Sequence, residues 1–321
     1  MELDKRTYLT SFTMLGLAMC LYSGLQVLGA YVYALVTNWI YGPEAGGLRW
    51  LSGLFSSSWT GMPIRYVFVL GIPSLLVYLF VCWMPVKKEP EAKLPPENFL
   101  AALVMAMGFG YIFNFAGAFI NFGVSLATGK SVLEMNPVTE MLDMMQPGMM
   151  LYVCMIGPVM EEVMFRGVFL RRARRFGDQT AVIYSAVLFG LMHGNLTQFF
   201  YATVIGMILG YVAVSTNRLR CSILLHILVN SYSAYLTAWS LFYEQSGGLF
   251  FTGLFSLGAL AAVAFFIAGA VWFFCTRGIH WWRNLKAAEG GKSPFRRYVW
   301  ANPGFFLFAV ISGLEMALYL L

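Results

Sequence analysis

The sequence predicts an all-α, polytopic membrane protein with about nine transmembrane helices. Three observations support this fold class: hydrophobic residues occupy 59% of the 321 positions, charged residues occupy only 11%, and the mean hydropathy is +0.69. An ordinary soluble domain carries about 25% charged residues and could not bury this much apolar surface in its core. The composition therefore excludes a soluble enzyme and indicates an integral membrane protein.

The predicted spans follow from the lengths of the apolar runs. A helix needs about 20 apolar residues to cross a hydrocarbon core about 30 Å thick. Runs of this kind cover residues 8–36, 63–84, 98–127, 148–170, 179–194, 197–217, 221–241, 249–275 and 302–321. The fifth run is short, so we expect the fifth and sixth spans to form a tilted hairpin that turns at HGNL (193–196).

The basic residues predict the orientation in the membrane. With a cytoplasmic N-terminus, 17 of the 21 Lys and Arg residues fall on the cytoplasmic side, and Arg166 alone lies within a span. Cytoplasmic loops carry such an excess of Lys and Arg. We therefore expect the N-terminus inside and the C-terminus outside. The compact chain with very short tails favours a prokaryotic plasma membrane.

The chain divides into three parts. Residues 1–147 hold the first three spans and an acidic, Met-rich outer loop (128–147) that could form an amphipathic surface helix. Residues 148–241 hold spans four to seven, which we take as the catalytic core. Residues 242–321 hold the last two spans, joined by a basic cytoplasmic linker (276–300) suited to anionic lipid headgroups. The basic runs all flank membrane spans, so we expect the bilayer as a partner and no nucleic acid.

Few ionisable groups lie at membrane depth. A charge at the bilayer centre costs about 2.5–3.5 kcal/mol on insertion scales, so each group needs a protein cavity or a partner. Five of the six fall in spans four to seven, which points to a functional site there. The sixth lies in the last span, and we expect it near the outer interface without a chemical role. The six are Glu161, Glu162, Arg166, His193, His226 and Glu315.

Helical geometry separates the two glutamates of the fourth span. Glu162 and Arg166 are four residues apart, about 40° on the helical wheel, and can form an ion pair. Glu161 and Arg166 are about 140° apart and cannot easily meet. Glu161 is therefore the freer carboxylate, which suits it to general-base chemistry. The alternative is that the set is only a clamp between helices.

Two further pairs lie on neighbouring spans. Phe189 and His193 share one face of the fifth span, and His226 and Asn230 share one face of the seventh. The second pair could donate hydrogen bonds to a common point. The alternatives are a hydrogen-bonded core histidine and a simple helix–helix hydrogen bond. Counted from the cytoplasmic ends, His226 and Asn230 reach the depth of Glu161, whereas His193 lies deeper unless its helix is tilted.

Three segments resemble known family motifs. EEVMFRG, FGLMH and HILVN match, in order, the EExxxR, FxxxH and HxxxN motifs of the CAAX-protease and bacteriocin-processing (CPBP, or Abi) family of intramembrane endopeptidases. The resemblance covers about residues 148–240, and all three motifs are complete. One such motif would be weak, but three in order on successive spans are specific.

The resemblance implies roles for four residues. Glu161 and His193 would hold and activate a water molecule, while His226 and Asn230 would form an oxyanion hole. The water would attack a peptide carbonyl as the glutamate takes its proton.

The resemblance also implies three supporting residues. Glu162 and Arg166 would support the catalytic glutamate, and Phe189 would shape the pocket around it. The N-terminal spans and the last two spans show no resemblance, so the substrate is not implied.

The role of a metal stays open at this point. Glu161, His193 and His226 could supply a His₂Glu zinc set with an open position. The chain lacks an HExxH helix, however, and relatives in the family look like glutamate-type proteases. We favour a site without a cofactor, with zinc as the alternative.

The sequence therefore predicts an intramembrane endopeptidase that cleaves a hydrophobic or membrane-anchored peptide or protein. One alternative is a non-catalytic membrane scaffold, or an immunity or regulatory partner. A proton-coupled transporter would also use intramembrane Glu and His residues. The chain lacks the repeats and paired broken helices of secondary transporters, which disfavours that reading.

Overall fold

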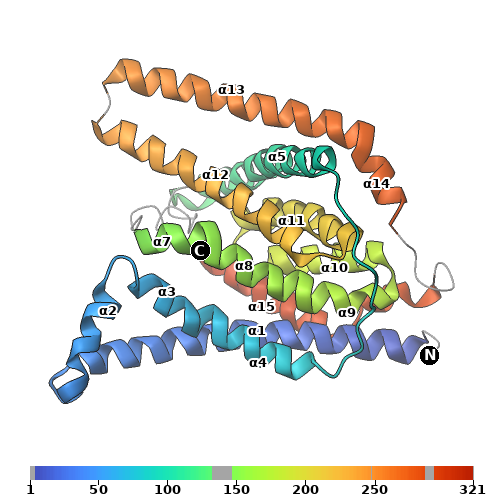
Figure 1. Cartoon of the computed structure of the whole chain (residues 1–321), viewed down its shortest axis with the longest axis horizontal. Coiled ribbons are helices and arrows are strands. Elements are labelled where there is room, and N and C mark those ends of the chain that lie inside the picture. Colours follow the sequence, from blue (N-terminus) through green and yellow to red (C-terminus); the bar gives the residue numbers. More distant parts are fainter. Residues whose placement is uncertain (1–3, 132–146, 247, 286–292, 321) are drawn as a thin grey trace.

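The computed structural model describes residues 4–131, 147–246, 248–285 and 293–320, and these residues form helices and connecting turns without a β-strand. The prediction of an all-α membrane protein is confirmed. Most helices lie along one direction, with the N-terminus at one end of the bundle (Figure 1). Eight helical stretches among the described residues are long and apolar enough to cross a membrane: Lys5–Tyr41, Gly61–Val81, Pro96–Thr128, Pro147–Phe176, Leu196–Thr216, Leu219–Trp239, Thr252–Arg283 and Pro303–Leu320.

The predicted fifth span differs from the structure. Helix α10 (Asp178–Leu191) has only 14 residues, which is about 21 Å, too short for a bilayer core of about 30 Å. The described residues therefore contain eight such spans where the sequence predicted about nine, and the difference is the fifth run. The apolar run of residues 179–194 includes a turn, and α10 is apolar because it is buried inside the protein. It does form the expected hairpin with α11 (Leu196–Thr216).

The N-terminal part contains one very long helix followed by shorter ones. Helix α1 (Lys5–Tyr41) spans the bundle, and the chain then returns along it through a π-helical turn to α4. The returning segments are η1 (Pro43–Leu51), α2 (Ser52–Ser56), α3 (Gly61–Tyr66), η2 (Val67–Gly71) and α4 (Ile72–Val81).

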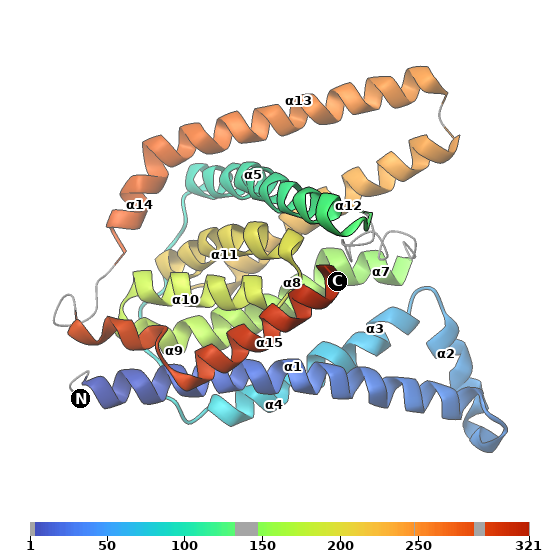
Figure 2. The same ribbon diagram turned by 180° about the vertical axis from the view of Figure 1, so that it is seen from behind.

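The first and last long helices pack together in the fold. Helix α15 (Pro303–Leu320) packs along α1, as seen from behind in Figure 2. The helices touch backbone to backbone, because a Cβ atom added to Gly16 would lie 2.2 Å from the carbonyl carbon of Gly304. Any larger residue at either position would separate α15 from the bundle.

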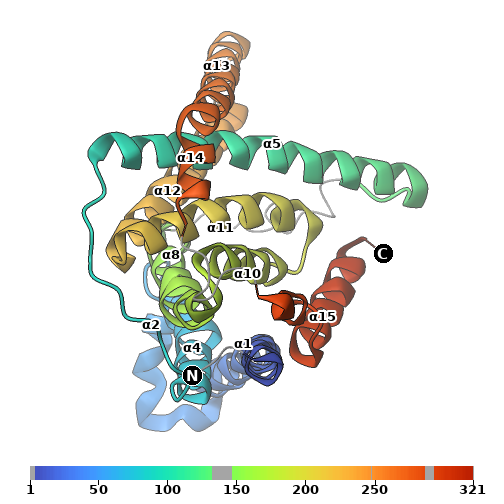
Figure 3. The same cartoon turned by 90° about the vertical axis from the view of Figure 1, so that its right-hand side faces the viewer.

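Helix α5 (Pro96–Thr128) crosses the direction of α1. It is foreshortened in Figure 1 but seen lengthwise in Figure 3, where α1 is viewed nearly end on. It packs between α11 and α13 (Leu249–Phe273). Gly108 permits this contact, since a Cβ atom there would lie 2.1 Å from the Phe266 carbonyl oxygen. Helix α12 (Leu219–Ser246) completes this side of the bundle.

The fourth span is continuous but irregular. Two stretches of π-helix flank the predicted glutamates, and such stretches often occur at functional sites. Its consecutive parts are α7 (Pro147–Leu151), η3 (Tyr152–Ile156), α8 (Gly157–Glu162), η4 (Val163–Leu170), α9 (Arg171–Ala173) and η5 (Arg174–Phe176).

Two predicted connections are only partly described. Most of the outer loop (128–147), residues 132–146, lies outside the described residues. The cytoplasmic linker (276–300) begins as a continuation of α13, through η6 (Phe274–Gly278) and α14 (Ile279–Arg283). It ends as a short 3₁₀ helix, η7 (Pro294–Val299), and residues 286–292 lie outside the described part.

Candidate active site

A fully buried ion pair lies at the base of the site. Arg166 Nη1 is 2.8 Å from Glu162 Oε1, and neither side chain is exposed, which confirms the pairing predicted from their spacing. Arg166 Nη2 also donates to the Gly206 carbonyl at 3.0 Å, and the guanidinium lies 4.7 Å from the centre of the Phe189 ring. These three contacts fix the arginine between the fourth span, α10 and α11.

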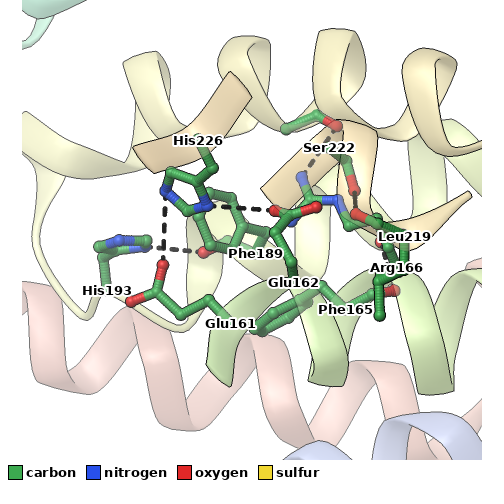
Figure 4. A network of polar contacts seen from close by, with 11 residues as sticks. Glu161, Glu162, Phe165, Arg166, Phe189, His193, Leu219, Ser222 and His226 are labelled. Carbon is green, nitrogen blue, oxygen red and sulfur yellow. Dashed lines mark hydrogen bonds and ion pairs between the residues drawn. The ribbon is translucent and has the colours of Figure 1, made fainter. Parts of the chain in front are cut away.

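His226 of α12 connects the two glutamates. Its Nδ1 is 3.1 Å from Glu162 Oε1, and its Nε2 is 3.7 Å from Glu161 Oε2 (Figure 4). One turn earlier on α12, Ser222 is fully buried beside Glu162 and donates to the Leu219 carbonyl at 3.0 Å. Ser222 was not among the predicted site residues. Its spacing of four residues from His226, on the same face of the helix, is the sequence signal that marks it.

Glu161 is the more accessible of the two glutamates. Its side chain is 16% exposed, whereas that of Glu162 is 0% exposed. Figure 4 shows its carboxylate lying between the imidazoles of His193 and His226. The structure therefore places the predicted free carboxylate where it faces two histidines, and Glu162 where it faces an arginine.

His193 reaches the same region despite its depth along the chain. It lies in the turn after α10, and its Nδ1 is 2.7 Å from the Phe189 carbonyl oxygen. A carbonyl only accepts, so Nδ1 carries the proton and Nε2 of the neutral ring is left as an acceptor. The Phe189 ring lies edge-on to both imidazoles, with centroids 5.0 Å from His193 and 5.7 Å from His226.

Asn230 lies one turn beyond His226 on α12. Its amide nitrogen donates to the Val153 carbonyl of η3 at 3.1 Å. The amide group has two N–H donors, so this bond uses one of them. Asn230 lies outside the glutamate–histidine network of Figure 4 and lines a cavity whose lining does not include Glu161, His193 or His226.

This cavity has a volume of about 420 Å³ and is bounded by α5, α11, α12 and the start of the fourth span. Its size is within the range of ligand pockets, about 300–1,000 Å³. The lining mixes apolar side chains with amide and hydroxyl groups, and the polar part includes Asn114, Gln198, Tyr201, Asn230 and Ser233. The sequence analysis did not foresee the contribution of α5, because no motif marks that helix.

The site does not have the form of a zinc site. Within the described ranges, no group of three or more His, Cys, Asp and Glu residues is arranged to hold a metal ion. His193 and His226 each direct Nδ1 to an oxygen atom and leave Nε2 on the side of Glu161, an arrangement that metal-bound and metal-free histidines share. The His₂Glu set of Glu161, His193 and His226 is therefore not assembled as a metal site where these residues lie, and the reaction proposed below uses the side chains alone.

Comparisons with known proteins agree with the three motifs. Residues 144–232 match the family model described as Type II CAAX prenyl endopeptidase Rce1-like. A protein of Bacillus subtilis (strain 168), named "Putative membrane peptidase YdiL", is 27% identical over 105 residues. That alignment covers 31% of this chain and 42% of the relative's length. No solved structure matches the chain.

The resemblance to the CPBP endopeptidases is thus confirmed over the segment that carries the motifs. The matched residues extend from just before the fourth span into α12. The family model leaves out the three N-terminal spans, α13 and α15.

Proposed function

Because residues 144–232 have the sequence of a membrane endopeptidase family, we propose that this protein is an intramembrane endopeptidase of the glutamate type. It would cleave a peptide bond in a hydrophobic or membrane-anchored peptide or protein. The observation that carries the proposal is the convergence of one accessible carboxylate and two imidazoles within the segment that matches the family.

Glu161 is the general base of the proposed reaction. A water held between Glu161 and His193 attacks the peptide carbonyl carbon, and the glutamate accepts one of its protons. Nε2 of His193 can accept a hydrogen bond from that water, because Nδ1 is committed to the Phe189 carbonyl. When the C–N bond breaks, the proton goes to the leaving amine. The products are one new carboxyl group and one new amine.

His226 and Asn230 stabilise the charge that develops on the carbonyl oxygen. His226 is fixed by Glu162 through Nδ1, so in this role its ring carries both N–H groups and Nε2–H is the donor to the oxyanion. Glu162 is in turn fixed by Arg166. Asn230 keeps one amide N–H for the oxyanion while the other bonds to Val153. Donors held in place before the reaction are each worth about 3–4 kcal/mol.

We propose that the cavity receives the substrate, with Asn230 as the proposed site residue in its lining. Its apolar lining suits a hydrophobic segment, and its amide and hydroxyl groups suit the polar backbone of an extended peptide.

We propose that the chain works in a prokaryotic plasma membrane. The distribution of basic residues supports an N-terminus in the cytoplasm.

Cells that carry Glu161→Ala are expected to accumulate an uncut membrane or peptide precursor. Removing the base leaves the fold intact, because Glu161 is not part of the buried ion pair. Comparative mass spectrometry of small peptides and membrane proteins measures this, with Glu97→Ala, an exposed carboxylate on α5, as the matched control. Unchanged peptide profiles in the Glu161 variant would rule out the proposed activity.

Treatment with a strong chelator is expected to leave cleavage unchanged within about twofold, since the site residues do not assemble as a zinc set. The purified protein would be dialysed against the chelator and assayed on a panel of hydrophobic fluorogenic peptides. Loss of cleavage that zinc alone restores would overturn the glutamate-type proposal and favour a metalloprotease.

A further inference from the structure

The sixth intramembrane ionisable residue meets the site from the last helix. The sequence placed Glu315 near the outer interface without a role, but in the structure its side chain lies against Gly194, next to His193. A Cβ atom added to Gly194 would lie 3.0 Å from Glu315 Oε2 and 3.4 Å from Glu315 Cβ. The contact exists because residue 194 has no side chain.

The turn that Glu315 touches determines where His193 lies. Gly194 has φ +63°, a left-handed conformation that suits glycine. Its N–H donates to the Leu191 carbonyl at 3.1 Å, and the His193 N–H donates to the Gly190 carbonyl at 3.2 Å. A shift of this turn would therefore move the His193 imidazole directly.

The same turn begins helix α11. Asn195 caps that helix, and its Oδ1 accepts from the Gln198 N–H at 2.9 Å. The first N–H groups of a helix lack partners within it and give this end a partial positive charge. A carboxylate placed against the residue just before the cap is therefore attracted to this end of α11.

Helix α15 is anchored so that Glu315 reaches this position. The backbone contact between Gly16 and Gly304 fixes it on α1. Asn302 caps it, with Oδ1 accepting from the Phe305 N–H at 2.9 Å. The helix lies outside the segment that matches the endopeptidase family, so this contact is a feature of this chain beyond the three motifs.

We propose that Glu315 is a positioning residue whose carboxylate holds the turn of residues 193–195 and thereby keeps the His193 imidazole beside Glu161. The effect of Glu315 on the position of His193 can be measured without any assumption about activity. Its effect on cleavage rests on the proposed function.

The chain has only three histidines, which makes the structural part directly measurable. In protein with ¹⁵N-labelled histidine, Glu315→Gln is expected to shift the ring signals of His193, identified by its loss in His193→Gln. His280 of α14, which bonds to Asn284 at 2.9 Å, serves as the internal reference. The neighbouring Leu314→Ala, at a site 62% exposed, is the matched control and should shift neither signal. Unchanged His193 signals in a folded Glu315→Gln variant would overturn the proposal.

A double-mutant cycle tests the contact itself. Glu315→Gln should lower kcat by about 10-fold with little change in KM or melting temperature, within the roughly 100-fold that misplacing a catalytic group by 1 Å can cost. Gly194→Ala and Glu315→Ala should each also lower kcat, and the variant that combines these two substitutions should lose less than the product of the two single losses, because removing the carboxylate relieves the new contact. The positioning role would be overturned if the kcat of the double variant fell by the product of the two single losses, or if Glu315→Gln kept the wild-type kcat.

A failure of the positioning role can be distinguished from a failure of the proposed function. If Glu161→Ala abolishes cleavage while the Glu315 variants leave it unchanged, the endopeptidase proposal stands and the positioning role falls. If Glu161→Ala has no effect but the His193 signals still respond to Glu315, the positioning role stands and the endopeptidase proposal falls.

Discussion

Arg166→Met is expected to lower the free energy of unfolding by about 3–5 kcal/mol, which is the usual cost of removing one partner from a buried ion pair. The variant leaves the Glu162 carboxylate in a site with 0% exposure, where His226 and Ser222 are the polar side chains beside it. It also removes the contact of the guanidinium with the Phe189 ring and its bond to the Gly206 carbonyl. Reversible unfolding of the purified protein in detergent measures the change.

Two further variants test whether the broken ion pair causes the loss of stability. Arg297→Met removes an exposed arginine near η7 and should change stability by less than about 0.5 kcal/mol. Arg166→Met combined with Glu162→Leu removes both charges, so it should recover much of the loss, as paired apolar replacements often do. An Arg166→Met variant as stable as the wild type would show that the buried pair does not support the fold.

Glu161→Gln is expected to reduce kcat by about 10³-fold or more while the melting temperature stays within a few degrees. General-base catalysis is typically worth 10²–10⁴-fold, and glutamine cannot accept the proton of water. The side chain is partly exposed and lies 3.7 Å from His226, so its loss removes no buried pair. A fluorogenic peptide assay in proteoliposomes measures kcat.

The matched control is Glu97→Gln, which removes an exposed carboxylate at the start of α5. It should retain the full kcat. If Glu161→Gln cleaves as fast as this control, another group activates the water and the role assigned to Glu161 is wrong.

The sequence could predict interactions that follow from local helical geometry. The pair of Glu162 and Arg166 is such a case, because a spacing of four residues on one helix places the two side chains together whatever the rest of the fold does. The eight long spans and the helical hairpin of α10 and α11 were predictable for the same reason. The length of an apolar run and the residues of a turn can both be read from consecutive positions in the sequence.

The contacts between distant parts of the chain could not be predicted in this way. The bond between His226 and Glu162 joins residues 64 positions apart, and the contact of Glu315 with Gly194 joins residues more than 100 positions apart. Both depend on how helices pack in three dimensions. The depth of His193 stayed open for the same reason, because it depends on how α10 is inclined in the bundle and a count of residues along the helix does not give that inclination.

The cavity illustrates the same limit. Its wall includes α5, whose sequence carries no motif and whose direction across the bundle is visible only in the structure (Figure 3). The three motifs thus locate the reactive groups, and the packing of the helices outside the motifs determines the space around them.

The most direct test of the account is cleavage in water enriched in ¹⁸O, followed by mass spectrometry of the products. If Glu161 and His193 activate water for attack on a peptide bond, the new carboxyl group will carry one ¹⁸O atom, and the Glu161→Gln protein will release almost none of this product. Products that lack ¹⁸O, or labelled product released at the wild-type rate by the Glu161→Gln protein, would contradict it.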